Sequence, residues 1–197
     1  MDTTQLPVLS LSASRERFAD DISSSLRRFG FALVADHGID AGLIAQGWDL
    51  TRQFFARPEA EKRRYFIEGL AGARGYTPFG IEIAKGAKAR DLKEFWHVGR
   101  DLPAGHPFAA TMPPNVWPEG LPGFQETFTR LFAAFDAAGS RILEAIALGL
   151  GLPYDWFADA TRDGNSVMRL LHYPPLDDPE PGAIRAGAHE DINLITL

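Results

Sequence analysis

The residues with the clearest chemical potential are His189 and Asp191, two positions apart near the end of the 197-residue sequence. Residues 192–197 are mostly β-branched or large apolar types, a composition that predicts a buried strand. Side chains alternate between the faces of a strand, so both side chains would project to one face, about 6–7 Å apart. An imidazole and a carboxylate on one face are two of the three ligands in the 2-His-1-carboxylate site of non-haem Fe(II). The alternative is a core histidine hydrogen-bonded to a nearby carboxylate, because so short a pair also arises by chance.

The composition narrows the chemistry further. The chain contains no cysteine, which excludes disulfides, zinc–thiolate sites, iron–sulfur clusters and thiol catalysis within it. The formal net charge of −6 argues against nucleic acid or an anionic membrane as the main partner. There is no run of about 18 apolar residues, and the first residues lack the basic and apolar regions of a signal peptide. We therefore expect a soluble, cytoplasmic protein of about one domain.

The elements that must position the pair begin with a strand, a helix and a second strand. Residues 6–11 and 31–35 have strand-like compositions, and the second strand is expected to be buried. Apolar residues at helical spacing predict a helix between them, capped by Ser12 or Ser14 and ended by Gly30. A second helix is predicted from Asp40 onwards. Its apolar stripe would consist of Ile44, Trp48, Thr51 and Phe55, with Leu43, Leu50 and Phe54 beside it.

The rest of the chain is predicted to hold one long helix and few strands. A short helix is expected over 58–65, and residues 69–118 are dense in Gly and Pro, with 94–98 as their clearest strand. The strongest helical pattern runs from Phe124 to a stop at Gly149 or Gly151 and predicts a scaffold helix that packs along a sheet. Residues 166–173 predict a further strand, which ends at two prolines.

Taken together, these segments resemble a known family. The chain is similar, over essentially its whole length, to the isopenicillin N synthase-like family of Fe(II)/2-oxoglutarate-dependent oxygenases, in a form typical of bacterial members. His189-Glu190-Asp191 falls where this family has its first two iron ligands. The other segments that carry the resemblance, by their order and spacing, are 6–11, 28–31, 36–39, 54–62, 74–80, 91–95 and 169–175.

The resemblance implies a fold and a chemistry. The expected fold class is α+β, a double-stranded β-helix (jelly roll) with N-terminal helices packed outside it. Residues 1–118 would form the N-terminal helical and strand region, 119–165 the long scaffold helix and a linker, and 166–197 the first strands of the jelly roll. The implied activity is O₂ activation at Fe(2+), with 2-oxoglutarate as co-substrate and a small organic molecule as substrate.

The resemblance also assigns roles to individual residues. His189 and Asp191 carry over as iron ligands, and Tyr173 matches a tyrosine near the 2-oxoglutarate carboxylate. Arg169 shares a strand face with Tyr173 and is a candidate cofactor-binding cation; the alternative is an exposed strand arginine. At Leu171 many plant members carry asparagine, so that co-substrate contact is not expected. Among the other histidines, His97 is expected in the core, whereas His172 should face away from Tyr173.

Two family features lie further along than this sequence extends. The distal histidine ligand and the Arg-x-Ser that binds the far carboxylate of 2-oxoglutarate fall several dozen residues after Asp191 in the family. We therefore expect the chain to be the front portion of a longer protein, with the C-terminal part of the barrel missing and with no activity on its own. Two other functions stay open, a non-catalytic jelly-roll binding module and a non-haem iron oxidase that does not use 2-oxoglutarate. Neither the organic substrate nor the oligomeric state can be predicted.

Overall fold

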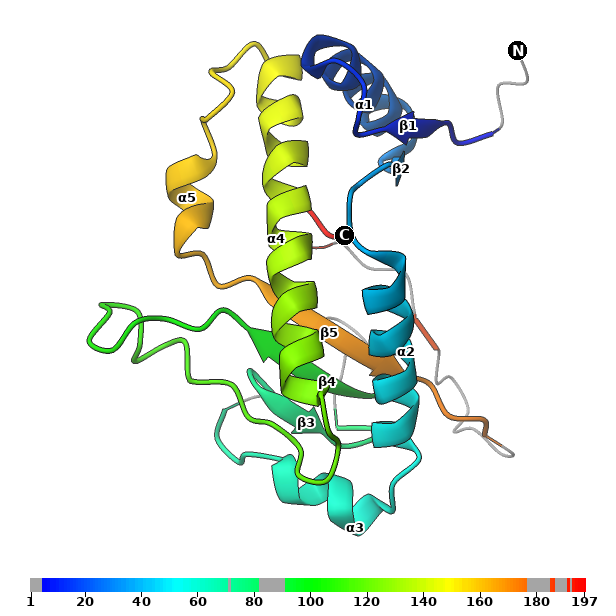
Figure 1. Cartoon of the computed structure of the whole chain (residues 1–197), viewed down its shortest axis with the longest axis vertical. Coiled ribbons are helices and arrows are strands. Elements are labelled where there is room, and N and C mark those ends of the chain that lie inside the picture. Colours follow the sequence, from blue (N-terminus) through cyan, green and yellow to red (C-terminus); the bar gives the residue numbers. More distant parts are fainter. Residues whose placement is uncertain (1–4, 71, 82–90, 177–184, 187–190, 192) are drawn as a thin grey trace. The chain divides into compact units, whose positions relative to one another are not determined.

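The computed structural model describes residues 5–70, 72–81, 91–176, 185–186, 191 and 193–197 (Figure 1). The described chain divides into two compact units. The first contains residues 1–40 and 133–164 with Leu197, and the second contains residues 41–132 and 165–196. Helix α4, Phe124–Gly149, begins in the second unit and ends in the first.

The first unit pairs two short strands beside helices. Strand β1, Val8–Ser10, lies parallel to β2, Leu33–Ala35. Between them, α1 covers Arg15–Phe29, and the side chain of Ser14 caps it by accepting a hydrogen bond from the Arg17 amide. Gly30 ends α1 in the left-handed conformation, which glycine adopts without strain. The predicted cap and stop are therefore confirmed.

The second strand of this unit corrects a prediction. We expected residues 31–35 to be buried, but Phe31 is 73% and Leu33 49% exposed. A strand with a single hydrogen-bonded neighbour has fewer residues to cover it than a strand inside a larger sheet. The helices of this unit approach closely instead: a Cβ on Gly149 of α4 would lie 1.7 Å from Ser23 Oγ of α1. Helix α5, Ala158–Arg162, follows α4 in the same unit.

The second unit packs helices on a three-stranded antiparallel sheet in the order β3–β4–β5 (Figure 1). The strands are β3, Gly75–Thr77; β4, Glu94–Gly99; and β5, Val167–His172. Helix α2 covers Ala41–Phe55, α3 covers Glu59–Lys62, and a 3₁₀ turn, η1, covers Arg63–Tyr65. The predicted strands over 94–98 and 166–173 are confirmed.

An aromatic core joins these helices to one face of the sheet. Phe54 of α2 meets Trp96 of β4 edge-to-face, with ring centroids 4.8 Å apart, and Phe124 of α4 meets Trp96 at 5.6 Å. Gly47 lets α2 approach α4, because a Cβ there would lie 2.6 Å from Leu131 Cδ1. The predicted stripe of α2 is confirmed at Thr51 and Phe55, which are buried, but Trp48 is 60% exposed. The buried face also contains Leu43, Leu50 and Phe54, which were expected beside the stripe.

The predicted strand after His189 is absent from the residues that the structure describes there. Asp191 and residues 193–197 have no strand assignment. Short polar side chains bond to one another instead: Asn193 Nδ2 donates to Thr196 Oγ1 at 2.9 Å, and Thr196 Oγ1 donates to Asp191 Oδ2 at 2.6 Å. Such local hydrogen bonds compete with an extended ladder.

Candidate metal and co-substrate site

Of the two predicted metal ligands, one belongs to the described chain. Asp191 is exposed, and its Oδ2 accepts the hydrogen bond from Thr196. His189 lies outside the described residues. Across the ranges that the structure describes, there is no group of three His, Cys, Asp or Glu side chains that could hold a metal. An imidazole and a carboxylate are nevertheless ligand types that suit Fe(II), and the absence of thiols agrees with such a site.

Tyr173 directly follows β5, and Arg185, which lies 12 positions later in the chain, contacts it. Arg185 Nη2 donates to the Tyr173 carbonyl oxygen at 2.6 Å. The guanidinium carbon of Arg185 also lies 5.5 Å from the centroid of the Tyr173 ring, within the range of a cation–π contact. The half-buried Tyr173 side chain thus has a cation beside its ring.

The sheet register places Arg169 and Leu171 on the same face, as predicted. Arg169 pairs with His97 and Leu171 with Phe95, so these four side chains project to one side. We call this side the open face, because Leu171 is 42% exposed and Arg169 is exposed as well. Arg169 is thus an exposed residue of the strand whose side chain also makes defined contacts.

Two aromatic side chains contact Arg169. Its Nε donates to His97 Nε2 at 2.5 Å, and its guanidinium carbon lies 4.6 Å from the Phe95 ring centroid. His97 is only 7% exposed, which confirms the predicted core position. On the other side of the imidazole, Nδ1 lies 2.5 Å from the carbonyl oxygen of Gly72.

A second arginine lies on the open-face side at the end of β4. Arg74 is 1% exposed, and its guanidinium occupies the place that a side chain at residue 99 would need, since a Cβ on Gly99 would lie 1.9 Å from Arg74 Cζ. Burial lowers the pKa of Arg74, and the nearby carboxylate of Asp101 opposes that shift. The sequence offered no signal for this placement.

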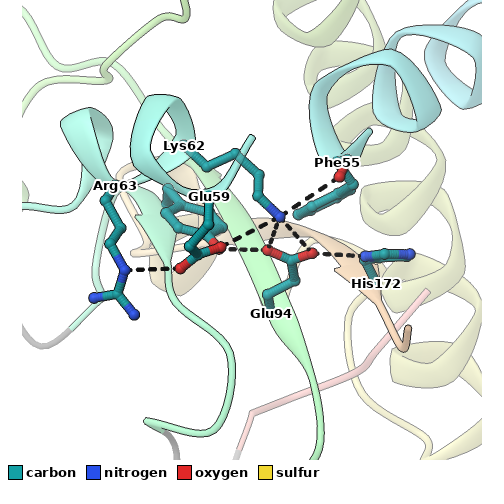
Figure 2. Close-up of polar contacts among 7 residues, drawn as sticks. Phe55, Glu59, Lys62, Arg63, Glu94 and His172 are labelled. Atoms are coloured by element: carbon teal, nitrogen blue, oxygen red, sulfur yellow. Dashed lines mark hydrogen bonds and ion pairs between the residues drawn. The ribbon is translucent and has the colours of Figure 1, made fainter. Parts of the chain in front are cut away.

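The opposite side, which we call the covered face, carries Glu94, Trp96 and Val98 of β4, Leu170 and His172 of β5, and Tyr76 of β3. Glu94 is buried there with three hydrogen-bonding partners (Figure 2). Lys62 Nζ lies 2.8 and 2.6 Å from its two carboxylate oxygens, His172 Nδ1 lies 2.7 Å from Oε1, and the Tyr76 hydroxyl donates to Oε2.

This network extends to helices α2 and α3. Lys62, which is itself buried, also lies 3.5 Å from Glu59 Oε2, and the Arg63 side chain pairs with the other oxygen of Glu59 at 2.8 Å (Figure 2). The His172 ring stacks on Phe55 with centroids 5.1 Å apart. The prediction that His172 faces away from the open side is therefore confirmed, and its partners are now identified.

The network sets the protonation of its members. Burial alone would raise the pKa of Glu94, but the hydrogen bonds from Lys62, Tyr76 and His172 outweigh burial and hold that pKa below its ordinary value. Burial raises the pKa of Tyr76, and the adjacent Glu94 carboxylate raises it further. Glu94 is therefore a carboxylate and Tyr76 a neutral donor at neutral pH. This charge pair is sealed between helix and sheet, so we assign it to stability rather than to chemistry.

Comparison with known proteins then decides the family. Residues 6–120 match the family model described as the N-terminal region of non-haem dioxygenases in morphine synthesis. The chain belongs to the Fe(II)/2-oxoglutarate-dependent oxygenase family. It is 29% identical to the 2-oxoglutarate-dependent dioxygenase tropC of Talaromyces stipitatus over 93% of this chain and 60% of the relative.

Solved structures of 2-oxoglutarate-dependent oxygenases are also similar to this chain. A 2OG-Fe(II) oxygenase family protein from Caulobacter crescentus is 46% identical, with a TM-score of 0.84 over 97% of this chain and 62% of that one. A full-length Neurospora crassa protein in complex with α-KG is 26% identical, with a TM-score of 0.75 over 94% of this chain and 61% of that one. The chain thus spans about 60% of the length of these relatives. Among the described residues, no helix is both long enough and apolar enough to cross a membrane.

Proposed function

We propose that the full-length protein is an Fe(II)/2-oxoglutarate-dependent oxygenase. The reaction would consume one O₂ and one 2-oxoglutarate, release succinate and CO₂, and insert the remaining oxygen atom into a C–H bond of a small organic substrate. The observation that carries this proposal is the match of residues 6–120 to the dioxygenase family, supported by the 46% identity to the Caulobacter structure. The complex of the Neurospora protein with α-KG supports 2-oxoglutarate as the co-substrate.

The proposal gives each candidate residue a role. His189 and Asp191 would be two of the three protein ligands of iron, and a third would complete the site. Bound iron would supply Lewis-acid and redox chemistry at the positions that the protein leaves open. Tyr173 would donate its hydroxyl hydrogen to a carboxylate of 2-oxoglutarate, and the Arg169 guanidinium would attract that carboxylate from the same strand face.

The proposal also includes the fold of the full-length protein, a jelly roll. In this account the β3–β4–β5 sheet is part of the double-stranded β-helix, with its open face towards the iron and its covered face against the helices. Residues 1–118, 119–165 and 166–197 keep the roles proposed from sequence. The apolar Leu171 side chain between Arg169 and Tyr173 would contact carbon rather than oxygen atoms of a ligand.

The test is an assay of the full-length protein with Fe(II), ascorbate, O₂ and 2-oxoglutarate, in which succinate is measured. We expect succinate release that requires Fe(II) and that is abolished in His189→Ala and Asp191→Ala. Asp159→Ala is the matched control, because this exposed aspartate forms a local ion pair with Arg162, at 2.7 Å.

Two results would replace the proposal. Iron-dependent O₂ consumption without succinate would identify an oxidase that does not use 2-oxoglutarate, a function that Leu171 favours because it cannot hydrogen-bond the co-substrate. An absence of both signals in properly folded protein would favour the non-catalytic module.

A further inference from the structure

We propose that Arg185 is a positioning residue: it ties the chain just before the proposed metal ligands to the end of β5, and so keeps Tyr173 close to the His189–Asp191 pair. This inference rests on the proposed function, in which Tyr173 donates to a carboxylate of 2-oxoglutarate and His189 and Asp191 bind the metal. Neither the spacing of residues in the sequence nor the family resemblance assigned a role to Arg185.

The end of β5 explains why a side chain makes this tie. The pairing of β4 with β5 ends at Glu94 and His172, so Tyr173 lies one position beyond the ladder. Two prolines follow, and proline has no backbone N–H with which to continue a ladder. A residue before proline is also restricted to extended conformations, which sets the direction of the Tyr173 carbonyl locally. A donor for that carbonyl has to come from solvent or from another part of the chain, and Arg185 supplies one.

Arg185 contacts Tyr173 at two points. Its Nη2 donates to the Tyr173 carbonyl oxygen at 2.6 Å, and a hydrogen bond from a charged donor is stronger than one between neutral groups. Its guanidinium carbon lies 5.5 Å from the centroid of the Tyr173 ring. One contact holds the backbone and the other lies beside the side chain, so a single guanidinium restricts both the position and the rotation of Tyr173.

The tie shortens the connection between the co-substrate residue and the first metal ligand. His189 lies 16 positions after Tyr173 but only four after Arg185. Four extended residues span no more than about 14 Å, so the contact limits how far His189 can lie from Arg185. In the loop-closure relation, the probability that two ends meet falls with the 3/2 power of their separation. A change from 16 positions to four therefore corresponds to a factor of about eight.

A ligand that contacts both Tyr173 and the metal benefits from this shorter connection. Binding to the first group places the ligand at the second group at a raised effective concentration. The metal alone contacts only its own ligands, so its affinity does not depend on Tyr173. Loss of the tie should therefore weaken the binding of 2-oxoglutarate more than the binding of the metal.

Two substitutions at Arg185 isolate the tie. Arg185→Met keeps the apolar stem of the side chain and removes the donor and the charge. Arg185→Lys keeps a charged donor on a stem of similar length. Arg17→Met is the matched control, because this exposed arginine pairs with Asp21 of the same helix, at 3.4 Å.

The first measurement needs neither metal nor co-substrate. Hydrogen–deuterium exchange of the full-length protein, followed by mass spectrometry, reports how readily the backbone opens in a peptide that covers 185–197. We expect faster exchange of this peptide in Arg185→Met than in the wild type, and unchanged exchange in Arg185→Lys and Arg17→Met. Equal exchange in the wild type and Arg185→Met would show that Arg185 does not tie the chain, and would overturn the proposal.

The second measurement is calorimetric titration of the Mn(II)-loaded full-length protein with 2-oxoglutarate. We expect Arg185→Met to raise the Kd of 2-oxoglutarate by up to about eightfold, the factor from loop closure, with a smaller change in the Kd of Mn(II). In a Tyr173→Phe background, Arg185→Met should have no further effect on the Kd of 2-oxoglutarate, because it acts through the Tyr173 hydroxyl.

Three results of the titration would contradict the positioning role. An unchanged Kd of 2-oxoglutarate in Arg185→Met would show that the tie does not serve binding, and an equal rise in both Kd values would assign Arg185 to the metal site as a whole. An undiminished effect in the Tyr173→Phe background would show that the guanidinium binds 2-oxoglutarate itself. If the wild type binds Mn(II) but no 2-oxoglutarate, the proposed function fails, and the exchange measurement still decides whether Arg185 ties the chain to Tyr173.

Discussion

The two faces of the β3–β4–β5 sheet hold their charged side chains at different depths, although β4 contributes residues to both faces. On the covered face, Glu94 is buried with a cation and two further hydrogen-bonding partners, so its charge is neutralised within the fold. On the open face, Arg169 is exposed, donates to the His97 imidazole and lies over the Phe95 ring.

This difference separates stability from function. A buried ion pair is costly to break, since removing one partner leaves the other charge in a medium that solvates it poorly. An exposed cation contributes little to stability, and in the proposed function Arg169 attracts a carboxylate of 2-oxoglutarate. Substitutions on the covered face should therefore change the free energy of unfolding, and those on the open face should change ligand binding.

The largest effect is expected from Lys62→Met. The methionine fills a similar volume but leaves the Glu94 carboxylate without its cation, which should lower the free energy of unfolding by about 3–5 kcal/mol. Urea denaturation of the full-length protein measures this. The double variant Lys62→Met/Glu94→Gln should recover part of the loss, because no unpaired charge remains. Arg52→Gln, at an exposed ion pair with Asp49, is the control and should change little. If Lys62→Met lowered the free energy of unfolding no more than Arg52→Gln does, the stabilising role of the covered face would be contradicted.

Tyr76→Phe should have the next largest effect. The hydroxyl of this fully buried tyrosine donates to Glu94, so its removal should cost about 1–3 kcal/mol. Thermal or urea unfolding is the measurement, and Tyr154→Phe, at a 50% exposed ring, is the control. If Tyr76→Phe and Tyr154→Phe had the same free energy of unfolding, the hydrogen bond from Tyr76 to Glu94 would contribute nothing to stability.

The pH dependence of stability should follow Glu94. Its pKa in the folded protein lies below the ordinary value of 4.5, so in the pH range between these two values the unfolded chain binds more protons than the folded one. The stability that Glu94 contributes is thus complete above about pH 4.5 and is lost as pH falls towards the folded pKa. Urea midpoints measured across this range should fall less steeply for Glu94→Gln than for the wild type. If the urea midpoints of the wild type and Glu94→Gln fell equally steeply with pH, the lowered pKa of Glu94 would be contradicted.

The smallest change in stability is expected on the open face, for Arg169→Gln. Loss of the contact with the Phe95 ring should cost about 0.5–1 kcal/mol, within the range of exposed cation–π pairs. Chemical denaturation measures the loss, and it should be accompanied by a raised KM for 2-oxoglutarate. A loss of several kcal/mol would place Arg169 with the covered-face residues and remove the distinction between the faces.

Local features of the fold could be predicted from sequence because their causes are local. Ser14 and Gly30 bound α1 through hydrogen-bonding and backbone conformations that depend on neighbouring residues. Likewise, the strand alternation correctly separated His172 from Arg169. Trp48 was misplaced because two adjacent stripes on α2 have similar apolar content, and the close approach at Gly47 chooses between them.

The site depends on contacts that a linear sequence does not reveal. Lys62 and Glu94 lie 32 positions apart, and a lysine beside Glu59 and Glu61 in a short helix has the pattern of a solvated surface. The bond from Arg169 to His97 spans 72 positions and depends on the strand register. His189 and Asp191 were found from sequence by their spacing, and their shared role stays a prediction.

The most direct test of the central claim, that the His189–Asp191 pair binds a catalytic metal, is titration of the full-length protein with Mn(II) as a redox-stable substitute for Fe(II). Calorimetry should detect one Mn(II) per chain in the wild type and in the control Asp159→Asn, and loss of this binding in Asp191→Asn and His189→Ala. Unchanged Mn(II) binding in Asp191→Asn, or no binding by the wild type, would contradict the account.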